Sequence, residues 1–408
     1  MQENKSKKSG TGSKKPVKKP AKKPASGKRP SSSGKAKGRK PAAGRYASEK
    51  RKNRLGRALL LVLPWCGAAL LYTAAEYAEG FANWYALHIY PLFEKTIGRL
   101  MNLVSFSVLE LLAYGLIAAA IISLIIGIGR IRAGRRSFKR ALGRALYRIF
   151  TLAGFAAMIF MLFGGVNYKR DTFAESYGLE VKTPDRSQLE DFLYMCVEEI
   201  NAVADEVERD GWGRCEAPKD AAEIAVSAMK TLGEEVELLS GYYPRPKLIW
   251  WTDFLSYQQV TGMYSPFTIE ATVNGAQPGY ELPSSMCHEL SHLKGFMRED
   301  EANFLAFLAC IGSESPEFRY SGWLVAFIYA GNDLAKYDYE RYVEIRELLK
   351  ESVKTDMSYG SSFWARFDGP VSEAQSKAND TYLKLNGQEA GVESYNQVVR
   401  LMISWFDK

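Results

Sequence analysis

Residues 287–306 read CHELSHLKGFMREDEANFLA, and this stretch holds two of the three histidines in the whole chain. His288 and His292 are four positions apart, so on a helix both imidazoles lie on one face and can reach one metal ion. Glu289 is rotated away from that face, yet it stays close enough to take a proton from a water molecule that the metal activates. The HExxH spacing therefore predicts a Zn2+ site with His288 and His292 as ligands and Glu289 as the catalytic base.

The second half of the same stretch predicts a third metal ligand on a second helix. Gly295 follows His292 by three residues, where the first helix is expected to end. A new helix is expected to begin near Arg298, and one of its faces is formed by Glu299, Ala302, Asn303 and Ala306. The small alanines permit close packing of two helices, which would bring Glu299 to the histidines and leave one position open for water. Asn303, one turn further, is expected to bond the free nitrogen of a ligand imidazole.

Glu301 is the competing candidate for the third ligand. Glu299 is preferred because it shares a helix face with the two alanines, whereas Glu301 does not. A purely structural explanation also stays open, because acids at positions 299–301 would stabilise the first turn of a helix through its dipole.

The residues on either side of the motif supply candidates for substrate binding. Short strands are predicted at residues 247–251 and 268–273. An extended peptide could add to the strand at residues 268–274, although an ordinary sheet strand would show the same pattern. Tyr320 and Tyr382 are candidate hydrogen-bond donors to the transition state. The chain has 23 tyrosines, so a structural role for either one stays open.

Residues 167–408 are long enough for one sizeable core and form the predicted globular domain. Amphipathic helices are predicted at residues 186–209 and 219–239. From Pro283 onward the pattern is mostly helical, with breaks expected near Gly295 and at residues 313–316, 369–370 and 387–391. The predicted fold class of the domain is α+β with helix dominant.

Three apolar runs precede this domain, at residues 58–75, 103–128 and 149–166. Each approaches the roughly 20 residues needed to cross a bilayer core, and none contains Lys or Arg. A membrane domain with three transmembrane helices is therefore predicted at residues 58–166. Glu110, near the start of the second run, is expected to reach the membrane interface, and a functional intramembrane acid is the alternative.

The distribution of charge predicts the orientation of these helices. Residues 1–57 hold 21 Lys and Arg against two acids, and residues 129–148 hold eight Lys and Arg and no acid. Both segments are expected to stay in the cytoplasm, whereas the aromatic-rich loop at residues 76–102 is expected outside, with an interfacial helix. Three spans then place residues 167–408 outside. The chain is thus predicted to be a multi-pass cell-membrane protein with a cytoplasmic N-terminus and an extracytoplasmic C-terminal domain.

The basic segment at residues 1–57 is predicted to be a disordered tail. Its first 44 residues are mostly Lys, Pro, Ser, Gly and Ala, with almost no large apolar side chain, and such a segment cannot form a core. Anionic lipid headgroups are its expected partner. A nucleic acid is disfavoured because no aromatic residue interrupts the basic run before Tyr46. A signal peptide is not expected, because no apolar core follows within the first 30 residues.

The motif stretch resembles an uncharacterised bacterial family of membrane proteins, the domain of unknown function 3810. The resemblance covers roughly residues 55–408. Besides residues 287–292 and 298–304, it rests on WYA at 84–86, IYP at 89–91, FRYSG at 318–322, NDTYLK at 379–384, NGQ at 386–388 and SY at 394–395. It implies three membrane spans followed by a zincin-like domain, and no established substrate.

A wider similarity is to zinc peptidases whose third ligand is the Glu of an ExxAD or ExxAN helix. That pattern maps onto Glu299, Ala302 and Asn303. Here the interval from His292 is short, and Asn stands where Asp is usual. The similarity implies a peptide-cleaving activity with Glu299 as the third ligand.

The leading prediction is a membrane-anchored, zinc-dependent metallopeptidase that hydrolyses peptides or proteins at the outer face of the cytoplasmic membrane. The alternative is a catalytically inactive membrane scaffold or receptor with a structural metal site. Such a site normally has four protein ligands, and no CxxC pair or further histidine lies nearby to supply the fourth. A tether that acts through the basic tail is a third hypothesis. Cleavage within the membrane is disfavoured, because charged residues follow the motif closely.

Overall fold

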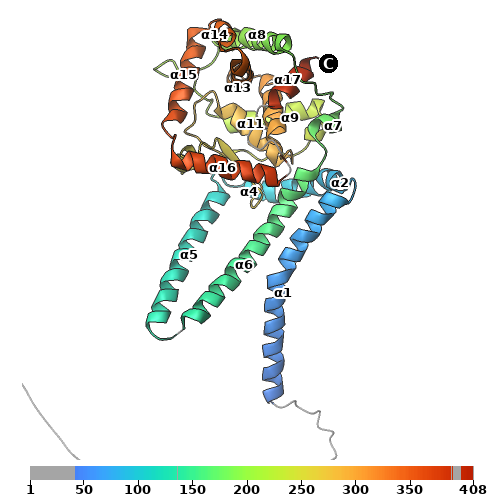
Figure 1. The fold of residues 1–408 in the computed structure, drawn as a ribbon, viewed down its shortest axis with the longest axis vertical. Helices are drawn as coiled ribbons and strands as arrows, with labels where there is room; N and C mark the ends of the chain where they lie inside the picture. Colours follow the sequence, from blue (N-terminus) through green and yellow to red (C-terminus); the bar gives the residue numbers. More distant parts are fainter. Residues whose placement is uncertain (1–41, 136, 387, 389–396, 408) are drawn as a thin grey trace, which may run out of the picture. The chain divides into compact units, whose positions relative to one another are not determined.

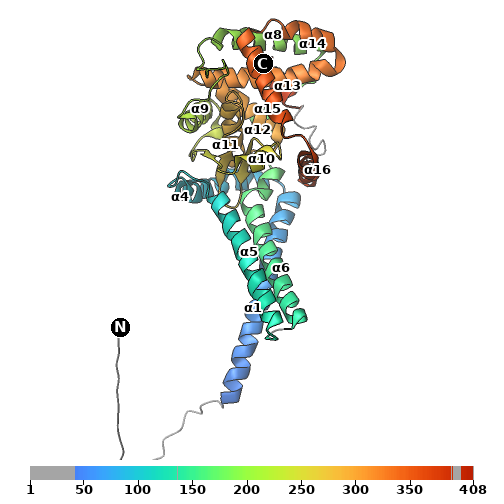
Figure 2. The same cartoon turned by 90° about the vertical axis from the view of Figure 1, so that its left-hand side faces the viewer.

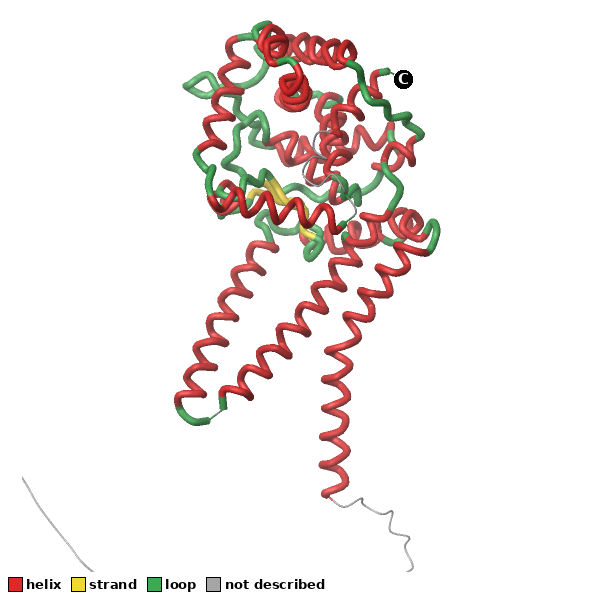
Figure 3. The backbone as a smooth tube through the Cα atoms, in the orientation of Figure 1, coloured by secondary structure: helices red, strands yellow, loops and turns green. Residues whose placement is uncertain are grey.

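The computed structural model describes residues 42–135, 137–386, 388 and 397–407. The chain divides into two units, residues 1–54 and residues 55–408. Of the first unit only the beginning of helix α1 (Ala42–Tyr77) is described. The second unit holds long apolar helices and a mostly helical domain (Figures 1 and 3).

The tail predicted to be disordered lies outside the described residues up to position 41. Residues 42–57 are helical instead, so the predicted boundary was wrong. Alanine, arginine and lysine are frequent in this segment, and these residues favour helix. They let the apolar helix that follows extend toward the N-terminus.

Three helices of the described part are long and apolar enough to cross a membrane: residues 55–77 of α1, α5 (Val108–Arg132) and α6 (Phe138–Phe163). We call them the membrane-length helices. Their number confirms the three predicted apolar spans, although α5 and α6 run further into the basic segment between them than predicted. Arginine and lysine are good helix formers, so a charged composition did not end either helix.

The segment between α1 and α5 consists of short helices: α2 (Phe81–His88), α3 (Tyr90–Phe93), a π-helical turn at Glu94–Gly98 and α4 (Arg99–Met101). An interfacial helix with exposed aromatic residues was predicted here. Trp84 is half exposed, but Tyr85 and Tyr90 are buried. The Tyr85 hydroxyl donates to the carbonyl of Leu162 at 2.7 Å, and the Tyr90 hydroxyl donates to the carbonyl of Leu293 at 2.9 Å. These two tyrosines therefore fix the segment to α6 and to the domain.

The domain after α6 begins with a 3-10 turn at Gly165–Lys169. Its helices are α7 (Phe173–Tyr177), α8 (Arg186–Val203), α9 (Ala221–Glu235), a 3-10 turn at Glu237–Leu239, α10 (Thr252–Ser256), α11 (Leu282–Leu293), α12 (Glu299–Ile311), α13 (Pro316–Tyr337), α14 (Tyr339–Arg346), α15 (Glu351–Ala365), α16 (Pro370–Leu385) and α17 (Val398–Phe406). Helices α11, α12 and α13 supply much of the buried core, against which α8, α9 and α17 pack. The helix-dominant prediction is confirmed.

Most of the predicted helix boundaries are also found. The chain breaks near Gly295, at residues 313–315 and at residues 366–369. The predicted helices at 186–209 and 219–239 end earlier, at Val203 and Glu235. The break expected at residues 387–391 falls almost wholly outside the described residues.

A small sheet lies beside α11. Its described strands are β1 (Lys247–Leu248), β2 (Gly262–Ser265) and β3 (Glu270–Val273), in the order β1-β3-β2. β1 pairs with β3 in parallel, and β2 pairs with β3 antiparallel, with Gly262 opposite Val273. β1 and β3 were predicted, whereas β2 was missed because Gly262 and Ser265 have little strand propensity.

Two buried carboxylates join the sheet region to the start of α5. Glu110, on the first turn of α5, accepts hydrogen bonds from the backbone N–H groups of Trp250 and Trp251, both at 2.9 Å. Glu270, at the start of β3, accepts from the N–H groups of Val108 and Leu109 at 3.1 and 2.9 Å. The sequence predicted that Glu110 reaches the membrane interface and did not indicate these backbone partners. Glu110 binds backbone groups of the domain, and Figure 2 shows α10, which follows Trp251, on the side from which α5 and α6 extend.

Candidate functional site

Helices α11 and α12 pack against each other through a tight turn. The N–H of Phe296 donates to the carbonyl of Ser291 at 3.2 Å, and the N–H of Gly295 donates to the carbonyl of His292 at 2.9 Å. These two bonds form a Schellman motif, which needs a left-handed residue after the helix. Gly295 supplies it with φ of 86°, and a Cβ atom there would lie only 2.9 Å from Nδ2 of Asn167. The turn reverses the chain and brings the start of α12 to the histidines.

The structure brings His288, His292 and Glu299 together. Oε2 of Glu299 lies 3.3 Å from Nε2 of His288 and 3.7 Å from Nε2 of His292. One ligand atom from each residue lies within 4.8 Å of the other two. The arrangement offers three convergent ligand atoms to one cation.

Both imidazoles are held by their other nitrogen. Nδ1 of His288 lies 2.8 Å from Oδ1 of Asn303, and Nδ1 of His292 lies 2.8 Å from the carbonyl oxygen of Phe296. Each acceptor is an oxygen, so each Nδ1 donates a proton and each Nε2 is turned toward Glu299. The predicted contact between Asn303 and an imidazole of the motif is present, and the Phe296 carbonyl is a partner that the sequence did not indicate.

Interactions within the cluster shift the pKa values of Glu299 and His292 in opposite directions. Burial raises the pKa of Glu299, but His292 and His288 outweigh burial and hold that pKa far below its usual value. Burial lowers the pKa of His292, but Glu299, Glu289 and the Phe296 carbonyl outweigh it and raise the pKa to about 9. In the absence of a metal, a proton on His292 thus balances the charge of Glu299.

Glu289 lies beside this cluster, packed against Gly262 of β2. Its carboxylate is buried, and Oε2 has no hydrogen-bond partner among the described residues. Burial, with the neighbouring charge of Glu299, raises the pKa of Glu289 to about 7. A Cβ atom at Gly262 would lie 2.5 Å from Oε1 of Glu289, so β2 can pass this close only because position 262 lacks a side chain.

These residues line a cavity of about 850 Å³. His288, Glu289, His292, Glu299 and Asn303 form its polar side. Other parts of the lining come from α6, α10, α13 and the residues around β2. A stripe of α16 also lines it, at helical spacing: Ser372, Gln375, Ser376, Asn379 and Tyr382. The cluster is therefore open to a space large enough for several residues of a peptide.

The strand that adjoins this cavity is β2, and not the predicted segment at residues 268–274. β3 pairs with β1 on one side and with β2 on the other, so it has no free edge to which a peptide could add. In β2, the backbone N–H and C=O groups of Met263 and Ser265 point toward β3. This follows because the N–H of Asn274 donates to the carbonyl of Thr261, and the direction of the backbone groups alternates along the strand. The backbone groups of Gly262 and Tyr264 then point away from β3, toward Glu289 and the cavity.

Of the two predicted tyrosine donors, only Tyr382 lines the cavity. Its hydroxyl lies 2.9 Å from the hydroxyl of Tyr168. Burial raises the pKa of Tyr382, the Tyr168 bond lowers it, and the charge of Glu299 raises it further. Tyr329 on α13 also lines the cavity, and burial and the charge of Glu299 raise its pKa. Tyr329 was not predicted, since no pattern sets it apart from the other tyrosines.

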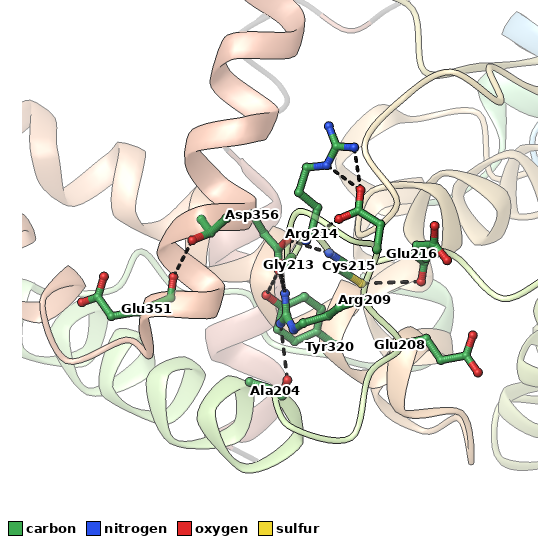
Figure 4. A network of polar contacts seen from close by, with 12 residues as sticks. Ala204, Glu208, Arg209, Gly213, Arg214, Cys215, Glu216, Tyr320, Glu351 and Asp356 are labelled. Carbon is green, nitrogen blue, oxygen red and sulfur yellow. Dashed lines mark hydrogen bonds and ion pairs between the residues drawn. The ribbon is translucent and has the colours of Figure 1, made fainter.

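The structure places Tyr320, the other predicted donor, in a separate buried network (Figure 4). Its hydroxyl donates to Oδ2 of Asp356 at 2.5 Å. Nη1 of Arg209 lies 2.8 Å from the same oxygen, and the N–H of Cys215 donates to Oδ1 at 2.7 Å. Tyr320 is fully buried in this network and does not line the cavity. Its role is to hold α13, α15 and the loop after α8 together.

The geometry also separates Glu299 from its competitor. Glu301 is buried on the other side of α12, where its Oε1 accepts from the N–H of Phe173 at 2.7 Å and lies 3.9 Å from Arg298. It does not line the cavity. Glu299 is therefore the carboxylate that faces the two histidines.

Comparison with known proteins gives a family for the chain. A family model described as a protein of unknown function (DUF3810) matches residues 85–403 of the chain. That range contains the whole His288–His292–Glu299 cluster, the sheet, α5, α6 and α16. Searches of curated proteins and of solved structures found no match.

Proposed function

The chain belongs to the DUF3810 family of proteins of unknown function, and we propose that it is a membrane-anchored, zinc-dependent metallopeptidase. The observation that supports this most is the convergence of His288, His292 and Glu299 beside the buried carboxylate of Glu289 in one cavity. We place the protein in the cytoplasmic membrane through α1, α5 and α6, with its domain on the outer face. The basic residues at the start of the chain and between α5 and α6 favour that orientation.

The residues present fit a zinc ion. Two ligand atoms about 2.1 Å from a tetrahedral zinc ion lie roughly 3.4 Å apart. The Glu299 oxygen lies 3.3 Å and 3.7 Å from the two imidazole nitrogens. A zinc ion held there would polarise a peptide carbonyl and acidify a water molecule.

The chain's own groups would move the protons. Oε2 of Glu289 would take a proton from the attacking water while the water oxygen bonds to the peptide carbonyl carbon. The same atom would then give the proton to the amide nitrogen, and the C–N bond would break to leave a carboxyl and an amine. The hydroxyl of Tyr382 would donate to the oxygen that gains charge, with Tyr329 as a second donor. The outward backbone groups of Gly262 and Tyr264 would hold the substrate in an extended conformation.

A catalytically inactive scaffold with a structural metal site is the second candidate. Structural zinc sites usually have four protein ligands, whereas catalytic sites keep one position open. The grouping found in the described residues has three ligands, and it faces a large cavity. These two observations favour catalysis over the structural alternative.

The first test is the zinc content of the purified full chain, measured by plasma mass spectrometry. We expect about one zinc ion per wild-type chain, lost in Glu299→Gln and retained in Glu301→Gln, the matched control two positions away. Glu289→Gln should retain zinc and lose cleavage of a randomised peptide library. A folded wild-type chain that binds no zinc, or a Glu289→Gln variant that still cleaves, would overturn the proposal.

A further inference from the structure

The cavity adjoins the end of a membrane-length helix. Phe160 and Gly164 contribute to its lining, and Tyr168 follows them in the next turn. Phe160 lies inside the apolar span Phe138–Phe163. This part of the cavity is therefore at the boundary of the span.

A second part of the lining is held at the start of another membrane-length helix. Phe254 of α10 lines the cavity, and its ring stacks on Trp251 with the centroids 4.8 Å apart. The N–H of Trp251 donates to Glu110, which is on the first turn of α5. Helices α5 and α6 are joined at the end away from the domain and diverge toward it (Figure 1). The cavity thus adjoins the domain-side end of α6, and Phe254 and Trp251 connect it to the start of α5.

Large aromatic side chains are exposed around this boundary. Trp250, Trp251, Phe254 and Phe267 are between 47% and 63% exposed, and tryptophan is enriched among lipid headgroups. Irregular backbone near a bilayer needs internal hydrogen-bond partners. Glu110 and Glu270 supply them to the residues at positions 250–251 and 108–109.

The C-terminal end of α11, the helix that carries His288 and Glu289, is also fixed at this boundary. Nζ of Lys294, which follows α11, lies 2.8 Å from Oε2 of Glu94, and both side chains are buried. The hydroxyl of Tyr90 donates to the carbonyl of Leu293 at 2.9 Å. Glu94 and Tyr90 both belong to the segment between α1 and α5. These two contacts therefore hold the His288–His292–Glu299 cluster at a fixed distance from the apolar spans.

We propose that the substrate is a transmembrane polypeptide, cut within a few residues of the point where its apolar segment leaves the bilayer. This inference rests on the peptidase function proposed above and names its substrate class. Phe160, Met263 and Phe267 give the cavity apolar surface beside the polar cluster. That surface would bind the apolar residues that continue into the substrate's membrane segment. The remaining extramembrane chain would then pass His288 and Glu289.

The experiment compares two substrate pools with the full chain reconstituted in phosphatidylglycerol–phosphatidylethanolamine vesicles. One pool carries a randomised 15-residue segment on a 20-residue Leu/Ala transmembrane helix, and the other carries the same segment without the helix. Mass spectrometry maps every cut. We expect the anchored pool to be cut at least tenfold faster, with most cuts within about six residues of the helix.

The position of the cuts separates this inference from a simple gain in local concentration. Cuts spread evenly along the anchored segment, or equal rates for the two pools, would overturn the inference and leave the peptidase proposal standing. No cut in either pool, from chain that has bound zinc, would overturn both. Phe254→Ala should slow cleavage of the anchored pool about fivefold without loss of zinc. Trp212→Ala, on an exposed loop of the domain, should leave the rate of cleavage unchanged.

A second measurement does not depend on turnover. A photo-crosslinker at the first extramembrane residue of an anchored peptide should attach to Phe160, Phe254 or Phe267 in the Glu289→Gln variant. Attachment only to helices away from the cavity, such as α8 or α14, would contradict the proposed entry from the bilayer.

Discussion

Nδ1 of His288 lies 2.8 Å from Oδ1 of Asn303, one helical turn beyond Glu299 on α12. The same helix therefore supplies both the carboxylate of the cluster and the group that orients one of its imidazoles. Loss of such an orienting partner commonly weakens metal affinity by about 10–100-fold. We expect Asn303→Ala to show a loss in this range in competition with a chelator.

Asn303→Asp is the matched variant for this prediction, because a carboxylate oxygen can still accept the Nδ1 proton. It should retain zinc affinity within about threefold of wild type. Equal affinities in wild type and Asn303→Ala would show that the hydrogen bond does not orient the ligand.

Gly262 should be required for activity and not for metal binding. A Cβ atom at this position would meet Oε1 of Glu289 at 2.5 Å, and its carboxyl carbon at 2.9 Å. We expect Gly262→Ala to displace the carboxylate and lower kcat by roughly 100-fold, the order found for the loss of a general base. Zinc content should be unchanged.

Gly275→Ala provides the control for that substitution. Its Cβ atom would lie 3.5 Å from Leu248, an ordinary contact, and Gly275 does not line the cavity. The variant should keep wild-type kcat and KM. A Gly262→Ala variant with normal kcat would mean that β2 can move aside and that Glu289 is not held against it.

Tyr382 and Tyr320 should differ in effect although both were candidates. Tyr382→Phe removes a hydroxyl that faces the cavity, and loss of a transition-state donor lowers kcat by about 100-fold or more. Tyr320→Phe removes a bond to Asp356, which keeps Arg209 and the Cys215 N–H. We expect it to lower stability by about 1–2 kcal/mol and leave kcat unchanged.

Kinetics and thermal melting of both tyrosine variants test this contrast. If Tyr382→Phe keeps full kcat, Tyr329→Phe becomes the informative variant, since Tyr329 is the other cavity tyrosine that senses Glu299. Full activity in both single variants and in the double variant would exclude Tyr382 and Tyr329 as the donors.

The grouping of His288, His292 and Glu299 could be predicted because its determinants are local in sequence. The i, i+4 spacing of the histidines, the glycine that ends α11 and the shared face of Glu299 and Asn303 all lie within 20 residues of chain. Helical periodicity fixes how such residues face one another. The acidic first turn of α12 left two candidates, Glu299 and Glu301. Packing separates them, because Glu301 accepts a hydrogen bond from the N–H of Phe173 on the opposite side of the helix.

The rest of the site depends on contacts between distant parts of the chain. Gly262 and Tyr329 come from a strand and a helix far apart in sequence, and neither carries a distinguishing pattern. β2 is short and contains glycine, so its propensity gave no signal. Glu110 had a clear position near the start of an apolar span, but its partners at positions 250–251 are about 140 residues away.

Glu281, just before α11, should make stability depend on pH. Burial raises its pKa to about 7, although Trp364 and Tyr280 act in the opposite direction through hydrogen bonds. A raised pKa means that the folded state holds the proton longer than the unfolded state, so stability falls as pH rises from about 4.5 to 7. Glu281→Gln removes this cost and should raise the free energy of unfolding by up to roughly 3 kcal/mol at pH 8. Its melting temperature in detergent with saturating zinc should exceed that of wild type at pH 8, by an amount that shrinks toward pH 5. Glu180→Gln, on an exposed side chain, should leave melting unchanged at every pH. A Glu281→Gln variant less stable than wild type at pH 8 would show that the bond from Trp364 to the charged carboxylate outweighs its burial.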